Sequence, residues 1–270
     1  MAEQASRVKL SARWASPPNR PLLLGHRGAR HAAPENTFAA FDLALEEGAE
    51  GVELDVRMNA SGDVIVCHDV TLDLVTNGRD TRAIHHLSSA ECRAVQLDGG
   101  ERLPFLKDVL DWADRHDACV NVELKTDGHR RPALVGAVAA LTRPRAARGN
   151  VLISSFNPLA VLGHRALSPA IPSAWLVDSA LGSELPLVIH AGNIALHPKH
   201  TIITAARMKL WKARVPRVHT WTVNDPERAR ELAALGVDCL ISDNPGVLRR
   251  ALEPAARAAH ADASRGHLAE

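Results

Sequence analysis

The chain has 270 residues, of which 46% are hydrophobic and 23% are charged, and its formal net charge is +1. A chain of this length can bury about three quarters of its unfolded surface in one large domain. The near-neutral charge excludes a global field that would draw the protein to nucleic acid or to an anionic membrane. No apolar run approaches the roughly 20 residues needed to cross a bilayer, so we expect no stable membrane association.

The cysteines and the N-terminal residues give information about the cellular compartment of the protein. The four cysteines are far apart and form no Cys-x-x-Cys pair, which argues against a zinc site made of thiolates; they are Cys67, Cys92, Cys119 and Cys239. We expect small buried side chains in a reducing compartment. The polar N-terminus lacks the apolar segment of a signal peptide, so a cytoplasmic location is expected.

Strand-like runs alternate with helical stretches over residues 21–254, which we take as one domain between two polar tails, 1–20 and 255–270. The expected strands are Leu22–Gly25, Gly51–Asp55, Val120–Glu123, Val151–Ser154, Ser173–Val177, Ile194–His197, Val218–Thr222 and Cys239–Ser242. The expected helices include Asn36–Glu47, Phe105–Arg115, Thr201–Ala213 and Pro226–Leu235. Eight β–α units in this length favour a closed (β/α)8 TIM barrel of the α/β class over an open sheet.

Residues 56–119, between the second and third expected strands, interrupt this alternation. Two apolar runs meet at Ser61-Gly62, which predicts a β-hairpin. A turn centred there places Asp55 opposite His68, and cross-strand partners share a face. The hairpin would therefore bring His68 back beside Asp55 at the barrel mouth. The remainder, about 69–104, is expected to form a small inserted lobe.

Acidic residues gather where strands end, and in (β/α)8 enzymes the working residues lie at the C-terminal ends of strands. Glu53 and Asp55 are two apart on one strand, so they point to one face, and Glu123 ends the next barrel strand. Two ionised carboxylates about 5 Å apart repel by roughly 3 kcal/mol at an effective dielectric of about 20. Three such oxygen donors suit one divalent cation, Mg²⁺ or Ca²⁺, with Mn²⁺ also acceptable. The alternative is that Glu53 and Asp55 simply pair with Arg27 and Lys125.

Two histidines are candidates for proton transfer. His26 follows the first strand, and His68 joins it through the hairpin. A free pKa of about 6.5 suits both acid and base roles near neutrality. Arg27 and Lys125 supply fixed positive charge, which suits a phosphodiester. Glu35 either buttresses Arg27 or His26 or is simply solvated.

Three further residues lie close to these positions. Asn36 is expected to act as the N-cap of the first helix and nothing more. His197 ends an expected strand, and we predict that it lines the pocket. Trp221 ends another strand and is either part of the core or a pocket wall.

Taken in order, the motifs of this chain resemble the glycerophosphodiester phosphodiesterase family over roughly residues 21–252. Any one of these short motifs is weak evidence, whereas the ordered set is specific. The motifs are Gly25-His26-Arg27-Gly28, Pro34-Glu35-Asn36-Thr37, Glu53-Leu54-Asp55-Val56, His68-Asp69, Glu123-Leu124-Lys125, Ser155-Phe156-Asn157-Pro158, Trp221-Thr222-Val223-Asn224 and Ser242-Asp243-Asn244-Pro245.

The resemblance implies a (β/α)8 barrel in which Glu53, Asp55 and Glu123 hold a divalent cation. It also implies that His26 and His68 are the acid and base, and that the two cationic side chains bind the phosphate. The substrate class comes from the resemblance alone. It would be a small glycerophosphodiester, hydrolysed to glycerol 3-phosphate and an alcohol such as choline or ethanolamine.

Two other functions are compatible with the same residues. A lysophospholipase D or sphingomyelinase-D-like enzyme would use the site on a lipid, although residues 70–104 contain no aromatic residue for an apolar lid. A barrel that binds phosphate ligands without turning them over would need neither His26 nor His68, and both are present. The sequence leaves the departing alcohol, the native metal and the oligomeric state open.

Overall fold

The computed structural model describes residues 12–127, 131–179 and 195–253 and contains the predicted barrel. Eight parallel strands follow one another around the ring, and pairing of the first with both the last and the second closes it. They are β1 (Leu22–His26), β2 (Gly51–Met58), β4 (Cys119–Leu124), β5 (Val151–Ser155), β6 (Ser173–Val177), β7 (Ala195–Pro198), β8 (Arg217–Thr220) and β9 (Cys239–Ser242). The expected (β/α)8 architecture is confirmed.

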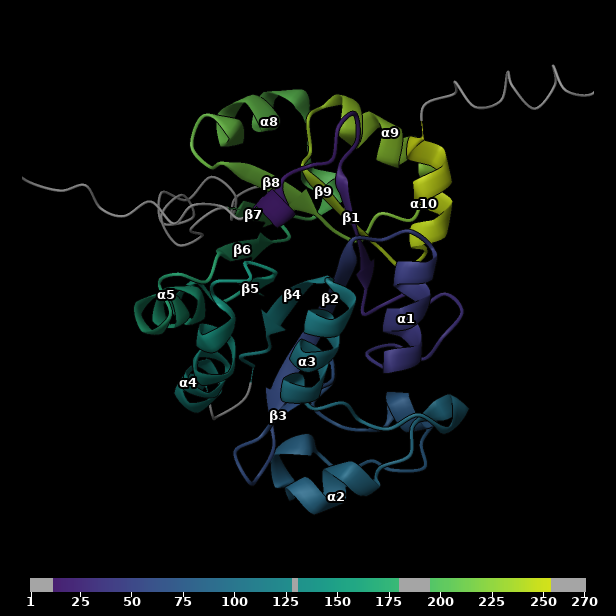
Figure 1. Ribbon diagram of the computed structural model, residues 1–270, viewed down its shortest axis with the longest axis vertical. Coiled ribbons are helices and arrows are strands. Elements are labelled where there is room, and N and C mark those ends of the chain that lie inside the picture. The colour runs from purple at the N-terminus through teal and green to yellow at the C-terminus, as the bar shows by residue number, and fades with distance from the viewer. Residues whose placement is uncertain (1–11, 128–130, 180–194, 254–270) are drawn as a thin grey trace, which may run out of the picture.

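Helices surround the strands, as Figure 1 shows. Those that flank the barrel in the described residues are α1 (Phe38–Glu46), α3 (Leu106–His116), α4 (Arg131–Thr142), α5 (Pro158–Leu167), α8 (Ala205–Lys212), α9 (Pro226–Ala234) and α10 (Pro245–Leu252). The helix expected over 201–213 is divided into a short 3₁₀ turn, η6 (His200–Ile202), and α8. The division falls at Thr204, whose side chain accepts a hydrogen bond from the Arg207 N–H and so begins a new helix.

Apolar side chains fill both sides of the barrel wall. Outward-facing Leu54 and Val122 belong to one buried cluster with Leu110 of α3. Inside the barrel, the first residues of β1, β4 and β9 cluster with Trp14. Asp55 and Glu123 lie away from Trp14, toward the C-terminal ends of the strands that form the barrel.

Trp14 changes the expected boundary of the domain. It lies in a short 3₁₀ turn, η1 (Ala12–Trp14), is fully buried, and its ring stacks 6.2 Å from that of His219. The sequence predicts a polar tail over 1–20, but residue 14 instead packs inside the barrel because its large apolar ring fills the space at the strands' N-terminal ends. Residues 1–11 and the predicted tail 255–270 lie outside the described residues.

The predicted hairpin is present, but its turn is centred one half-residue earlier than expected. The end of β2 pairs with antiparallel β3 (Val64–Val66), and the Asn59 N–H donates to the Asp63 carbonyl at 3.0 Å. Residues 59–63 therefore form an odd-numbered loop centred on Ser61. Gly62, with φ 93°, supplies the left-handed backbone conformation that this turn requires.

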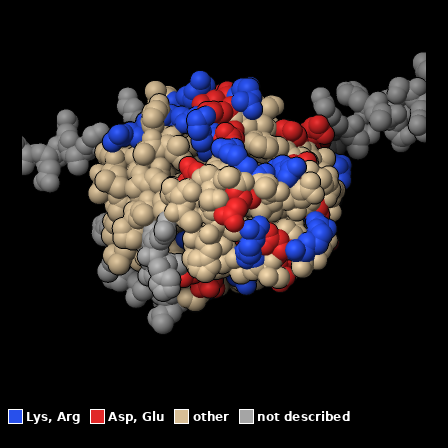
Figure 2. Space-filling model, turned by 90° about the horizontal axis from the view of Figure 1, so that it is seen from below, with Lys and Arg blue, Asp and Glu red and all other residues tan. Residues whose placement is uncertain are grey.

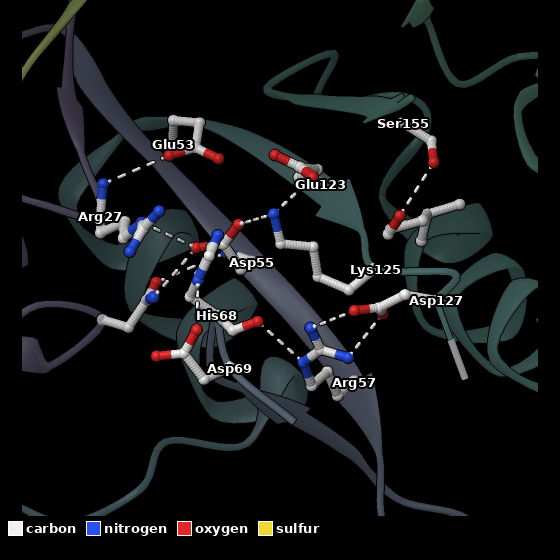
Figure 3. Close-up of polar contacts among 12 residues, drawn as sticks. Arg27, Glu53, Asp55, Arg57, His68, Asp69, Glu123, Lys125, Asp127 and Ser155 are labelled. Carbon is white, nitrogen blue, oxygen red and sulfur yellow. Dashed lines mark hydrogen bonds and ion pairs between the residues drawn. The ribbon is translucent and has the colours of Figure 1, made fainter. Parts of the chain in front are cut away.

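The shifted turn changes the partner of Asp55. Its carbonyl accepts from the Cys67 N–H at 2.9 Å, so Cys67 lies opposite Asp55, and the prediction that His68 does so is wrong. His68 comes one residue later, after the ladder has ended. It still reaches the barrel mouth, and Figure 3 shows its ring beside Asp55.

The predicted lobe follows β3 and has its own small core; Figure 1 shows the lobe's chain around α2. Its elements are η2 (Leu74–Thr76), η3 (Ile84–His86), α2 (Ser89–Ala94) and η4 (Asp98–Gly100). A separate buried cluster that includes Leu72, Leu87 and Leu97 holds them together. A reciprocal pair of hydrogen bonds between Ser88 and Glu91 caps α2.

From the composition we expect neither nucleic acid nor a membrane as a partner, and two features of the structure concern that expectation. No helix in the described residues is long and apolar enough to cross a membrane. On the face shown in Figure 2, positive and negative side chains are interspersed, in keeping with the net charge of +1.

Candidate active site

Three carboxylates converge at the mouth of the barrel. Glu53 and Asp55 lie on β2, and Glu123 lies on the adjacent β4, where it is the register partner of Asp55. One carboxylate oxygen from each residue lies within 4.8 Å of the others, and all three residues are buried. The parallel pairing of β2 with β4 therefore brings together the side chains that the sequence selects.

The three carboxylates differ in their preferred protonation state. Burial raises the pKa of Glu53 well above its ordinary value, and the charges of Asp55 and Glu123 raise it further. Burial and the charge of Asp55 also raise the pKa of Glu123, to about 7. Burial would raise the pKa of Asp55 too, but Lys125 and Arg27 outweigh it and hold that pKa below its usual value.

Two cations are interleaved with the carboxylates, as Figure 3 shows. Lys125 Nζ lies 2.7 Å from Glu123 and 3.1 Å from Asp55, and Arg27 Nε lies 3.1 Å from Asp55. Pairing with cations, the alternative to metal binding, is thus present for two of the three acids. Among the described residues Glu53 forms no ion pair with either cation; it accepts the Arg27 main-chain N–H at 3.3 Å.

The donor set fits a hard divalent cation. Carboxylate oxygens are the ligands that Mg²⁺ and Ca²⁺ prefer, and three of them meet here within one ion's reach. Glu53, which is buried and forms no ion pair with Arg27 or Lys125, would gain most from such an ion, because burial and two neighbouring charges oppose its ionisation.

The turn after β1 places Arg27. This residue and Gly28 have φ values of 55° and 85°, and a Cβ on Gly28 would lie 2.6 Å from Ala40. The close approach of the turn to α1 therefore requires glycine at this position. Glu35 buttresses Arg27, as one of the sequence alternatives proposed, with its Oε1 2.8 Å from Arg27 Nη1.

Asn36 has a different role from the predicted one. Thr37 is the N-cap of α1, since its side chain accepts from the Ala40 N–H. Asn36 instead has φ 57° and donates through Nδ2 to Asp55 Oδ2 at 3.2 Å. The reason is geometric: the left-handed backbone conformation of Asn36 turns its side-chain amide away from the helix and toward Asp55.

His26 is held by a carboxylate from the opposite end of the sequence. Its Nδ1 lies 2.6 Å from Asp243 Oδ1, and its Nε2 lies 4.0 Å from Glu53 Oε2. Asn224 Nδ2 donates to the other oxygen of Asp243 at 2.7 Å. Burial alone would raise the pKa of Asp243, but the bonds from His26 and Asn224 keep it below its ordinary value. The carboxylate thus stays ionised and orients the imidazole.

His68 is held in a similar way by its neighbour in sequence. Its Nδ1 lies 2.8 Å from Asp69 Oδ1. Burial lowers the pKa of His68, against the opposing charge of Asp55, so the net direction is downward. A histidine that is neutral near pH 7 can accept a proton, and its carboxylate partner would stabilise the charged form.

A cavity of about 200 Å³ opens at these groups. It is lined by His26, Arg27, Glu53, His68, Asn121, Glu123, Lys125, Phe156, Leu176, Trp221 and Ile241. Trp221, for which the sequence left two roles open, lies in its wall with its ring edge-on to Phe156 at 5.4 Å.

His197 does not line this cavity, so that prediction is wrong. Its side chain is fully buried inside the barrel, 4.7 Å from the ring of His219, and its contact with Trp221 is made by its main-chain carbonyl. Its ring lies inside the barrel against that of His219 and is not among the groups that line the cavity. Burial lowers its pKa well below the ordinary value.

Sequence reasoning missed three residues of the site: Asn36, Asp69 and Asp243. All three stand inside motifs that carry the family resemblance, so their positions were visible but their roles in the site were not. An acidic residue directly after His68 was the available signal for Asp69. Asp243 lies 217 positions from His26. The signal for it was a carboxylate directly after the last barrel strand, where working residues of such barrels lie.

The fold and the mouth together define a (β/α)8-barrel phosphodiesterase. A sequence profile of the glycerophosphoryl diester phosphodiesterase family matches residues 26–247. The chain belongs to this family.

Individual relatives agree with this assignment. A glycerophosphodiester phosphodiesterase of Caldanaerobacter subterraneus is 29% identical over 232 residues, which cover 84% of this chain and 96% of the relative. A putative glycerophosphoryl diester phosphodiesterase from Silicibacter pomeroyi has a similar structure, with a TM-score of 0.80, 28% identity, and coverage of 90% and 96%. A phosphodiesterase from Oleispira antarctica, solved in complex with the product sn-glycerol-3-phosphate, gives a TM-score of 0.77 at 26% identity, covering 87% and 98%.

Proposed function

We propose that this protein hydrolyses glycerophosphodiesters to glycerol 3-phosphate and a free alcohol, with one divalent cation at the barrel mouth. The observation that carries the proposal is the cluster of three buried carboxylates at the barrel mouth, two of which, Glu53 and Glu123, line one cavity with both histidines. Each of these histidines contacts a further carboxylate. Membership of the family and the glycerol phosphate bound to the Oleispira antarctica relative support the substrate class.

Glu53, Asp55 and Glu123 would hold the cation, for which Mg²⁺, Ca²⁺ and Mn²⁺ are all suitable. When bound, it supplies Lewis-acid polarisation of the phosphate and lowers the pKa of a glycerol hydroxyl. With the carboxylates so engaged, Arg27 and Lys125 have charge to offer the phosphate oxygens, which gain negative charge in the transition state. Both cations line the same cavity as the histidines.

His26 and His68 would move the protons. One removes the proton of the attacking hydroxyl while the other protonates the departing alcohol, a contribution typically of about 10²–10⁴-fold. The carboxylates of Asp243 and Asp69 fix the orientation of the two rings and stabilise each ring while it carries the extra proton. Trp221 and Phe156 form the apolar wall against which the substrate would lie.

We further propose a cytoplasmic location. Its support is that Cys67, Cys92, Cys119 and Cys239 are all buried and unpaired, as expected in a reducing compartment.

The proposed activity is tested by a screen with added metal. Glycerophosphocholine and glycerophosphoethanolamine are compared with lysophosphatidylcholine and sphingomyelin, and release of the alcohol is measured with Mg²⁺, Ca²⁺ or Mn²⁺. Turnover of the water-soluble diesters with at least tenfold preference supports the proposal. Preference for the lipids would instead favour a lysophospholipase D or sphingomyelinase-D-like enzyme, and phosphate-ligand binding without turnover of any substrate would favour a binding protein.

A further inference from the structure

Arg57 lies beside the site but belongs neither to the candidate metal ligands nor to the candidate phosphate-binding residues described above. It is on the part of β2 that extends past the barrel and pairs with β3, two residues beyond Asp55 and therefore on the same face of the strand. Its side chain is only 10% exposed. A buried guanidinium must have its donors satisfied, and the partners of Arg57 are specific.

The guanidinium of Arg57 joins two separate segments, as Figure 3 shows. Nε donates to the main-chain carbonyl of His68 at 2.8 Å. Nη1 and Nη2 donate to the two carboxylate oxygens of Asp127 at 2.7 and 3.0 Å, a bidentate geometry that fixes the plane of the guanidinium. Because Asp127 follows β4, the pair also ties the chain after β3 to the loop that carries Lys125.

No other hydrogen bond from the described part of the chain reaches the main chain of His68. The last hydrogen bond of the β2–β3 ladder is made by Cys67, so His68 begins the loop that enters the lobe. Its ring is bonded to Asp69, which belongs to the same loop and would move with it. Beyond the Cys67 bond, it is Arg57 that ties the main chain of His68 to β2.

We propose that Arg57, held in plane by Asp127, is a positioning residue that fixes His68 for proton transfer. The proposal rests on the proposed function. Arg57 acts through the backbone of His68 and touches no reacting atom. Loss of the bond would leave His68 in the cavity but with a wider range of positions, and a displacement of about 1 Å can cost on the order of 10²-fold in rate. Arg57 also lines a cavity of about 300 Å³ that shares His68, Glu123 and Lys125 with the site, so a direct role in substrate binding would appear as a change in KM. A role in positioning His68 would instead lower kcat.

The test is a double-mutant cycle between Arg57→Gln and His68→Ala, measured with glycerophosphocholine and saturating Mg²⁺. Arg57→Gln alone should lower kcat by about 10- to 100-fold and change KM by less than about threefold. In the His68→Ala background the same substitution should cost less than about twofold, because its effect is carried by a side chain that is already absent. An equal loss in both backgrounds, or a change confined to KM, would overturn the proposal.

Arg145→Gln is the matched control. Arg145 is similarly buried and also joins carboxylates, those of Asp111 and Asp114, to a main-chain carbonyl, but it lies after α4, away from the cavity. Its loss should lower the melting temperature and leave kcat unchanged. If Arg57→Gln fails to fold, the cycle is run with Asp127→Asn, which spares the Arg57–His68 bond and should lower kcat by a smaller factor that also vanishes without His68. Wild-type enzyme inactive on every diester would refute the proposed function, whereas active wild type with additive losses refutes only the role of Arg57.

Discussion

His26 Nδ1 lies 2.6 Å from Asp243 Oδ1, a contact between residues 217 positions apart that closes across β1 and β9. This contact directs Nε2 of the ring toward Glu53 and the cavity. Asp243→Asn should therefore lower kcat by roughly 10²-fold, because the imidazole loses both its orientation and the stabilisation of its charged form. In a His26→Ala background the same change should have little further effect on steady-state kinetics.

Activity is expected to depend on a divalent cation held by Glu53, Asp55 and Glu123. Chelation should abolish turnover, and Mg²⁺, Ca²⁺ or Mn²⁺ should restore it. The same ions should raise the melting temperature, because a ligand that binds only the folded state stabilises it. Glu53→Gln should remove most of that thermal shift. Full activity in the metal-stripped protein, or an equal shift in the variant, would contradict this assignment.

His26→Ala and His68→Ala should each lower kcat by about 10²–10⁴-fold while the protein remains folded. Both rings lie at a solvent-accessible cavity and contribute little to the apolar clusters, so their loss should cost little stability. Kinetics and circular dichroism on the same samples separate the two effects. A variant that melts much earlier, with normal specific activity in its folded fraction, would mark that histidine as structural.

Stability should fall as the pH drops below about 6.5. Burial lowers the pKa of His219 to about 3, that of His164 to about 4 and that of His197 well below its ordinary value. In the unfolded chain each would take up a proton near pH 6.5, so the unfolded state binds more protons below that pH and is favoured there. For one such residue the loss between pH 6.5 and 4 is roughly 3 kcal/mol.

The check is the pH dependence of denaturant unfolding for His219→Gln. The variant should show a shallower loss of stability between pH 6.5 and 4 than the wild type. His86→Gln, at an exposed position in the lobe, is the control and should leave the slope unchanged. Parallel curves for wild type and His219→Gln would show that this residue is accessible to protons in the folded state.

We expect hydrolysis to proceed in two steps, with a cyclic glycerol phosphate as the intermediate. The 2-hydroxyl of the glycerol attacks phosphorus as one histidine takes its proton, and the phosphorus–oxygen bond to the alcohol breaks as the other donates one. Water then opens the ring with the two roles exchanged, which accounts for the presence of both His26 and His68. An attacking group on the same molecule gains effective molarity that reaches about 10⁵ M or more.

A substrate analogue with hydrogen in place of that 2-hydroxyl tests this route. Its turnover should be lower by several orders of magnitude, with binding largely kept. A rate near that of the parent substrate would show instead that water attacks directly.

Much of the fold could be predicted from local patterns in the sequence. The β6 strand begins and ends at the predicted residues, Ser173 and Val177, because a short apolar run bounded by breakers is a local signal. Pro226 begins α9 as expected, since its missing N–H is not needed in the first turn. The register of the hairpin was harder to predict. The sequence around 59–63 is compatible with a loop of an odd or an even number of residues, and only the backbone hydrogen bonds distinguish the two.

Local patterns in the amino-acid sequence were enough to predict the (β/α)8 barrel and to select the carboxylates, histidines and cations at its mouth. Strand periodicity and the parallel order of the strands suffice to bring the strand ends together. Three contacts could be found only in the folded molecule: that of His26 with Asp243, that of Asn36 with Asp55 and that of Arg57 with the His68 carbonyl. The first contact joins residues 217 positions apart. The geometry of all three depends on how the ring closes and how the loops pack, which local patterns do not encode.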